Sequence, residues 1–273
     1  MKNNIETTGE RLIEETYITT HSGYVIYLFH KASYELALPY CKDKKVIDLG
    51  CGSGYGSTFI TKVSKNYTGV DVSNEAVLYA QERYGNNNTT FMKISSSEPL
   101  PFSDNSFDTA LSFQVIEHVK LPDSYLQEAK RILKPNGTLI IITPDKANRL
   151  LCIQQPWNRW HLVEYSLDEL KALAGKQFKI AKATRMGAIP EIANVELNRC
   201  KKIKWVTLIL TLKIYPTRVR VAFLNALHNI ISLLPKKKKH LNIETPLYTS
   251  DGIKLGVPSK ESINLVVICK KTN

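Results

Sequence analysis

The chain has 273 residues, of which 43% are hydrophobic, and its formal net charge is +12. This length and composition are typical of a folded globular protein and exclude an intrinsically disordered one. The first residues lack the apolar core of a secretory signal, and no run of about 18 apolar residues could span a bilayer, so we expect a cytoplasmic location. The five cysteines are odd in number and include no CxxC pair, which argues against a disulfide framework.

The positive charge is concentrated in one segment. Between Arg199 and His240 there are eleven basic residues and no Asp or Glu, and the rest of the chain is nearly neutral. A nucleic-acid partner would favour basic residues interleaved with exposed aromatic ones, whereas this segment has apolar and basic residues in blocks. The pattern favours an anionic membrane surface as partner and makes nucleic acid the weaker alternative.

The amino-terminal segment is predicted to cover the core. Residues 1–23 are polar and are expected to form an arm, and Tyr24–Tyr40 has apolar positions partly at helical spacing, with Pro39 near the end of the helix. His30 lies on this otherwise apolar helix, so we expect a packed histidine there and not a catalytic one.

The stretch VIDLGCGSGYG, from Val46 to Gly56, begins with an apolar run typical of a buried strand that ends in Asp48. Gly50, Gly52 and Gly54 follow at every second position, which lets backbone amides approach a ligand because no Cβ intervenes. The spacing is GxGxG, so the GxGxxG fingerprint of dinucleotide sites is not met, and the lysine of a phosphate-binding loop is missing.

A second short strand, Tyr67–Asp71, also ends in a carboxylate, and Asp71 is placed to accept hydrogen bonds from two ribose hydroxyls. With this strand the chain resembles the class I S-adenosylmethionine-dependent methyltransferases, whose first motif looks like VIDLGCGSGYG and whose second ends like GVD. The resemblance covers Lys45 to Phe178. It implies S-adenosylmethionine as cofactor, bound by Asp48, the three glycines, Asp71 and Val72, and a doubly wound, Rossmann-like α/β sheet of seven strands with the last antiparallel.

The next elements continue the resemblance with one departure. Ser73 is predicted to cap a helix that runs to about Tyr84, and Thr89–Ile94 is the third strand. Family members often carry an Asp after this strand that contacts the adenine amino group, where this chain has ISSSEPLPF. The adenine contact is therefore expected from Ser95, Ser96 or backbone groups.

The fourth strand and its exit, SFDTALSFQVIE from Ser106 to Glu117, are similar to the family pattern FDxVxSxxVxEH. The resemblance implies that Phe113 and Gln114 emerge over the cofactor and that His118 follows them at the pocket. The chain has neither the proline pair nor the cysteine that the family uses after this strand for nucleobase methylation, which argues against a nucleobase acceptor.

The remaining core elements follow in order. Asp123–Leu133 is predicted as an amphipathic helix, and KPNGTLIIITPD as a turn and a fifth strand. Ser166 and Glu169 form a capping box that fixes the start of the next helix. Phe178–Arg185 is the sixth strand, and Ser262–Cys269 is the closing, antiparallel one.

His161 and Glu164 lie in the loop WNRWHLVEYSLDEL, which precedes the capped helix. Loops at the carboxyl ends of strands often carry chemistry, and Trp157 and Trp160 are expected to stack on a sugar or an apolar acceptor.

Methyl transfer to an alcohol needs a group that removes the hydroxyl proton, and a histidine suits that task. His161 and His118 are both candidates, with Glu164 or Glu117 as the orienting carboxylate, and the sequence leaves the choice open. These four residues have no fixed metal-ligand spacing, so no metal site is predicted.

The basic segment is predicted as a helical insertion before the last strand. Ile203–Tyr215 is apolar and β-branched, Pro216 interrupts it, and Thr217 begins an amphipathic helix followed by Lys236–Lys239. We expect this insertion to rest on an anionic membrane face, peripherally at the inner membrane. The alternative is that its apolar face packs on the sheet domain or on a second subunit. The predicted division is an arm and cover helix (1–40), a methyltransferase core (41–197), the insertion (198–240), and a loop with the closing strand (241–273).

The acceptor is predicted only as a class. TGERLIEE, EH and NRWHLVEYSLDEL resemble methyltransferases of bacterial glycan and cell-envelope pathways, which implies O-methylation of a small-molecule, glycan or lipid-linked acceptor. The alternatives are methylation of a small lipid or quinone-like phenol, an RNA-directed methyltransferase, and a cofactor-binding protein without activity. The oligomeric state is not predicted.

Overall fold

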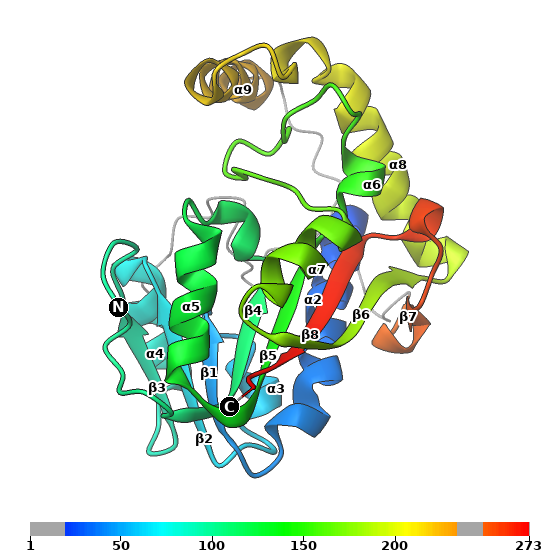
Figure 1. Cartoon of the computed structure of the whole chain (residues 1–273). Coiled ribbons are helices and arrows are strands. Elements are labelled where there is room, and N and C mark those ends of the chain that lie inside the picture. Colours follow the sequence, from blue (N-terminus) through cyan, green and yellow to red (C-terminus); the bar gives the residue numbers. More distant parts are fainter. Residues whose placement is uncertain (1–19, 234–247, 273) are drawn as a thin grey trace.

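The computed structural model describes residues 20–233 and 248–272 and has one central sheet (Figure 1). The strands lie in the order β3-β2-β1-β4-β5-β8-β6-β7. Neighbours from β3 to β5 are parallel, whereas β8 is antiparallel to both β5 and β6. The predicted doubly wound α/β fold with an antiparallel closing strand is confirmed. The strands are β1 (Lys45–Leu49), β2 (Asn66–Asp71), β3 (Thr89–Lys93), β4 (Phe107–Phe113), β5 (Leu133–Pro144), β6 (Lys179–Ala188), β7 (Ile253–Leu255) and β8 (Asn264–Lys270).

The predicted number of strands was wrong by one. The sheet has eight strands in place of seven, because β7 pairs antiparallel with the end of β6 from Met186 to Ala188. This edge strand has only three residues, IKL, which is too short to show the alternation that identifies a strand from sequence.

Helices cover both faces of the sheet, and successive residues of the central strands alternate between them. Ile140 and Ile142 belong to the core beneath α2, α3, α4 and α8, while Leu139 and Ile141 belong to the core beneath α5 and α7. The helices are α2 (His21–Cys41), α3 (Ser57–Ile60), α4 (Asn74–Tyr84), α5 (Pro122–Ile132), α6 (Lys146–Arg149), α7 (Leu167–Gly175), α8 (Pro190–Val206) and α9 (Thr217–Leu233).

Local sequence signals set several helix ends. The side chain of Thr20 accepts from Gly23 N at the start of α2, which continues through Pro39 to Cys41. Ser73 caps α4, and the predicted Ser166–Glu169 capping box is present at α7. The helix that follows the glycine loop, α3, begins at Ser57 and is a single short turn. The predictions for the residues 1–19, including TGERLIEE, lie outside the described residues.

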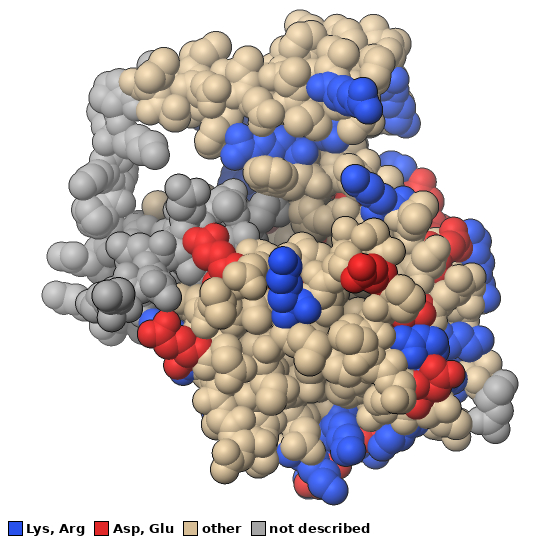
Figure 2. Space-filling model, turned by 90° about the vertical axis from the view of Figure 1, so that its left-hand side faces the viewer, with Lys and Arg blue, Asp and Glu red and all other residues tan. Residues whose placement is uncertain are grey.

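The segment 190–233 lies beside the sheet domain and projects beyond it (Figure 1). Its first helix, α8, begins at Pro190, ahead of the predicted start of the insertion at residue 198, and α9 follows after a short 3-10 turn at Ile209–Thr211. In Figure 2 this segment forms the upper part of the molecule and overhangs the body. Among the described residues, no helix is long and apolar enough to cross a membrane. The lysines Lys236–Lys239 lie outside the described residues.

Candidate functional site

The glycine loop after β1 has a backbone that only glycine adopts without strain. Gly50, Gly52 and Gly54 have φ angles of 79°, 55° and 77°. A Cβ on Gly50 would lie 2.6 Å from Val115 Cγ2, and one on Gly54 would lie 2.5 Å from Ala80 Cβ. A Cβ on Gly52 would meet nothing within 4 Å. Gly52 therefore presents its backbone to open space, as a loop that cradles a ligand must.

Asp71, at the carboxyl end of β2, is held in place by the backbone of this loop. Its Oδ2 accepts from Gly52 N at 3.0 Å, and its Oδ1 accepts from Ser73 N at 2.8 Å. Each carboxylate oxygen has more than one acceptor site, so these bonds orient the group and leave capacity for ribose hydroxyls. The next residue, Val72, is 56% exposed and offers an apolar surface beside it.

Asp48 lies beneath the loop and not at its open side. It is fully buried, and its Oδ2 accepts from the hydroxyls of Tyr34 at 3.0 Å and Tyr67 at 2.7 Å. Burial raises its pKa to about 6, although the two tyrosine hydrogen bonds lower the pKa and Asp71 raises it further. Asp48 thus joins α2 to the first two strands.

The other predicted cofactor residues are arranged as follows. Ser95, directly after β3, has its Oγ 3.0 Å from Ser97 Oγ, and Ser96 is exposed. Phe113 is buried edge-on against Tyr34, with ring centroids 5.1 Å apart. Gln114, with a φ of 57°, lines the cavity described next, as expected for a residue that emerges from β4.

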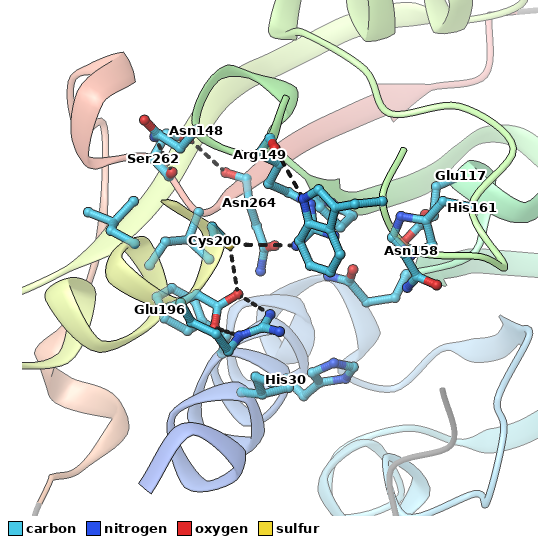
Figure 3. A pocket seen from close by; sticks show the side chains of 18 of the residues that line it. His30, Glu117, Asn148, Arg149, Asn158, His161, Glu196, Cys200, Ser262 and Asn264 are labelled. Carbon is cyan, nitrogen blue, oxygen red and sulfur yellow. Dashed lines mark hydrogen bonds and ion pairs between the residues drawn. The ribbon is translucent and has the colours of Figure 1, made fainter. Parts of the chain in front are cut away.

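A cavity of about 190 Å³ opens at the carboxyl ends of β4 and β5, between α2, α8 and the segment 144–161. Figure 3 shows Glu117 and His161 together on one side, with Glu196 and Cys200 on the other. His30 also lines the cavity, and burial lowers its pKa to about 4, so this imidazole is uncharged at neutral pH.

Of the predicted catalytic residues, His118 and His161 line this cavity, and Glu164 contacts His161 from outside the lining. The rings of His118 and His161 meet edge to face, with centroids 4.8 Å apart. Nδ1 of His161 is 2.9 Å from Glu164 Oε1, and that oxygen is 3.0 Å from Arg149 Nε. Burial alone would raise the pKa of Glu164, but Arg149 and His161 hold it below its usual range. His161 is therefore oriented by a buried, ionised carboxylate.

Backbone hydrogen bonds join the two segments that carry the histidines. The carbonyl of Glu117, in the 3-10 turn Ile116–His118, accepts from Leu162 N at 2.8 Å and from Val163 N at 3.3 Å. Nδ1 of His118 in turn lies 3.1 Å from the carbonyl oxygen of Trp160.

Sequence reasoning missed Arg220, which it counted among the basic surface residues. Arg220 projects from α9, is fully buried, and donates to the carbonyls of Pro156, Asn158 and His161. The available signal was its spacing, because Arg220 and Leu224 are one turn apart and are the two buried side chains of α9.

The predicted stacking surface of Trp157 is used within the protein. The guanidinium of Arg149 lies 4.1 Å from its ring centroid, and that of Arg199 lies 5.5 Å away. Arg199 also pairs with Glu196 through two hydrogen bonds of 2.7 and 2.6 Å. Trp160 carries a guanidinium too, that of Arg159 at 5.0 Å from its ring centroid, but it is 48% exposed.

The glycine loop fits S-adenosylmethionine. The open side of Gly52 leaves room for the ligand to lie against the protein backbone. The Asp71 carboxylate can accept hydrogen bonds from a ribose diol, and the exposed Val72 can pack against the face of an adenine ring.

Comparison with known proteins agrees with S-adenosylmethionine as the cofactor. Residues 47–141 match the family model described as a methyltransferase domain. A Mycobacterium tuberculosis protein named "probable S-adenosylmethionine-dependent methyltransferase" is 32% identical over 166 residues, 61% of this chain and 58% of that protein. The fatty-acid O-methyltransferase of Mycolicibacterium smegmatis is 27% identical over 116 residues, 42% of this chain and 41% of that one.

The fold of most of the chain is also similar to that of solved structures. The S-adenosylmethionine-dependent methyltransferase from Mesorhizobium loti matches with a TM-score of 0.56 at 12% identity, covering 89% of this chain and all of that one. This likeness shows the fold alone. The chain spans less than two thirds of the length of the curated relatives described above, 58% in the first case.

Proposed function

We propose that the protein is an S-adenosylmethionine-dependent methyltransferase that methylates a hydroxyl oxygen on a lipid-linked acceptor, such as the headgroup of a glycolipid. The observation that carries the proposal is the cavity beside Gln114, where His118, His161 and the Glu164–Arg149 pair lie at the carboxyl ends of the strands that follow the glycine loop. Ligands of open α/β sheets bind at this edge.

The cofactor supplies a methyl group activated by its sulfonium charge. In the overall reaction the carbon–sulfur bond breaks with its electron pair staying on sulfur, the new carbon–oxygen bond forms, and the hydroxyl releases one proton. The chain must therefore hold the acceptor in line, exclude water and assist loss of that proton. With Nδ1 of His161 donating to Glu164, Nε2 carries the lone pair that acts on the hydroxyl side of the reaction.

The lining of the cavity supports a polar headgroup as the reacting part. Asn148, Asn158 and Asn264 line it together with Arg149 and Glu196, and these groups both donate and accept hydrogen bonds, as sugar hydroxyls require.

The projecting segment supports a lipid attachment. Of the seventeen exposed large apolar side chains among the described residues, nine lie between 205 and 233. The most exposed include Ile209 at 72%, Ile214 at 78% and Leu233 at 84%. Lys201, Lys202, Lys213 and Arg218 are exposed nearby along the same segment. Apolar side chains beside cations suit the headgroup boundary of an anionic bilayer, and the fatty-acid methyltransferase relative acts on a lipid by its name.

On this proposal the enzyme works peripherally at the cytoplasmic face of the membrane. The body of the molecule carries the cofactor, and the segment 190–233 meets the lipid that bears the acceptor.

The experiment supplies deuteromethyl-labelled S-adenosylmethionine to the purified full chain, together with separate lipid, polysaccharide and RNA fractions of the host cell. Mass spectrometry should find the label on oxygen in the lipid fraction, and His161→Ala should abolish it. Label in RNA would overturn the proposed acceptor, and tight cofactor binding without label in any fraction would overturn methyl transfer itself.

A further inference from the structure

Glu117 is a buried carboxylate whose charge is incompletely compensated by the protein. Its side chain is fully buried, and its Oε2 accepts from Thr143 Oγ1 at 2.8 Å. Its Oε1 has no hydrogen-bond partner, and among the described residues no Lys or Arg forms an ion pair with it. Buried carboxylates of this kind are normally paired with a cation or bound to a metal.

Two imidazoles lie next to this carboxylate. One potential ligand atom from each of Glu117, His118 and His161 can be chosen so that all three lie within 4.8 Å of one another. Two histidines and one carboxylate form a ligand set that suits transition-series divalent cations such as Zn²⁺, Fe²⁺ and Mn²⁺, and it leaves positions open for water or substrate.

The groups around these three residues are those that orient metal ligands. Nδ1 of His161 contacts Glu164, and Nδ1 of His118 contacts the Trp160 carbonyl. Donation from both Nδ1 atoms makes Nε2 the lone-pair atom of each imidazole, as a metal ligand requires. Thr143 fixes the Glu117 carboxylate in the same way. Histidine ligands of metal sites typically donate their other N–H to a carboxylate or a backbone carbonyl.

We propose that Glu117, His118 and His161 bind one transition-series divalent cation, whose open side faces the cavity and takes the acceptor hydroxyl. The role toward the hydroxyl rests on the proposed function, whereas the cation site itself does not. The cation acts as a Lewis acid that lowers the pKa of the hydroxyl bound to it, so that the proton leaves to solvent as the methyl group is transferred. His161 then acts as a ligand, and Glu164 is a positioning residue.

This site departs from the expectation drawn from the sequence, which predicted no metal. Glu117 and His118 are adjacent in the chain, but His161 is more than forty residues away. Their convergence depends on the bonds from Leu162 N and Val163 N to the Glu117 carbonyl, which no spacing rule reveals.

The test is a titration of Co²⁺ into the metal-stripped full chain, followed by the visible d–d absorption, with Zn²⁺ as competitor. We expect one equivalent to bind and the bands to disappear on addition of Zn²⁺. Glu117→Gln and His161→Ala should each remove the bands, and Glu164→Gln should weaken affinity by about 10- to 100-fold, as loss of an orienting partner does. Binding should also weaken as pH falls through the range in which imidazoles protonate.

The matched control is His228→Ala, which removes an exposed histidine on α9 and should leave the titration unchanged. Cys152→Ser removes the exposed thiol as a competing ligand. Cofactor affinity and thermal unfolding show whether each variant is folded.

Co²⁺ affinity that is equal in wild type, Glu117→Gln and His161→Ala would overturn the site. Full methyl transfer by chelator-treated protein with no bound metal would overturn the role of the cation and leave the proposed function standing. Stoichiometric Co²⁺ binding by a protein that labels no acceptor would overturn the proposed function and leave the cation site standing.

Discussion

The glycine loop and the histidine cavity lie at the same edge of the sheet but are held by different means. The loop is built locally, since Gly50 to Ser73 provide its backbone conformation and both hydrogen bonds to Asp71. The cavity is built from distant side chains, with Arg149 fixing Glu164 and Arg220 fixing the carbonyl of His161. The glycine loop can therefore be predicted from a sequence motif, whereas the histidine cavity depends on contacts that form only when distant segments pack together.

The largest effect is expected from His161→Ala, which should change the histidine cavity and leave the glycine loop intact. Turnover should fall by about a hundredfold or more, because the group that assists proton loss is removed, and cofactor affinity should not change. A radiolabel transfer assay and calorimetric titration with S-adenosylmethionine measure the two quantities. Near-normal turnover in this variant, together with a large loss in His118→Ala, would move the central role to His118.

The converse change is Asp71→Ala on the cofactor side. Loss of a charge-assisted contact to ribose should weaken S-adenosylmethionine binding by about 1.5 to 3 kcal/mol, or roughly tenfold to a hundredfold. Gly52→Val should act in the same direction, because it places a branched side chain at a φ of 55° in the open cradle. Calorimetry provides the affinities and circular dichroism the fold. Unchanged affinity in Asp71→Ala would remove Asp71 from the cofactor site.

A smaller effect is expected from Arg220→Met, which removes the three guanidinium bonds between α9 and the loop of His161. Turnover should fall by about tenfold with cofactor affinity retained, because displacements of about 1 Å at a reacting group are costly. Arg220→Lys should not restore the activity, since an ammonium cannot reproduce the planar fork that serves three carbonyls. Arg218→Met, at an exposed position of the same helix, is the control. Equal turnover in the Arg220 and Arg218 variants would show that the loop holds its shape alone.

The smallest effect concerns the outer surface. Lys213→Gln should weaken binding to anionic vesicles by about fivefold, since a lysine near such a surface contributes about 1 kcal/mol. The difference should shrink as salt rises, and neutral vesicles should show none. Cosedimentation with vesicles measures both, and Lys179→Gln on β6 serves as the control lysine. If the wild-type protein does not bind anionic vesicles at low salt but does bind RNA, the partner is nucleic acid and not the membrane.

The same contrast explains what the sequence could predict. The Ser166–Glu169 capping box depends on neighbours within one helical turn, and Asp71 and the three glycines belong to one strand–loop–helix–strand unit. Residue types and spacing therefore determine the geometry of both. The capping of α4 by Ser73 was predictable for the same reason.

Features that depend on long-range contacts were not predictable. Only the one-turn spacing to Leu224 separates Arg220 from the exposed Arg218 in the sequence, and burial of the guanidinium depends on three carbonyls some sixty residues away. Arg149 likewise became important only through its contacts with Glu164 and the Trp157 ring. The predicted pairing of His161 with Glu164 was within reach because the two residues are three apart in one loop.

The buried guanidinium of Arg220 couples two binding events: docking of α9 on lipid and binding of the acceptor near His161. Its three carbonyl bonds mean that the helix and the loop of His161 are ordered together. Docking of the helix on lipid would stabilise this ordered arrangement and so strengthen acceptor binding by some factor. Thermodynamic linkage then requires that bound acceptor strengthen the docking of the helix by the same factor. An enzyme of this kind would be retained on the bilayer while acceptor remains and released as it is consumed. Arg220 would share the coupling free energy with Gln155, whose side chain donates to the carbonyls of Leu212 and Tyr215.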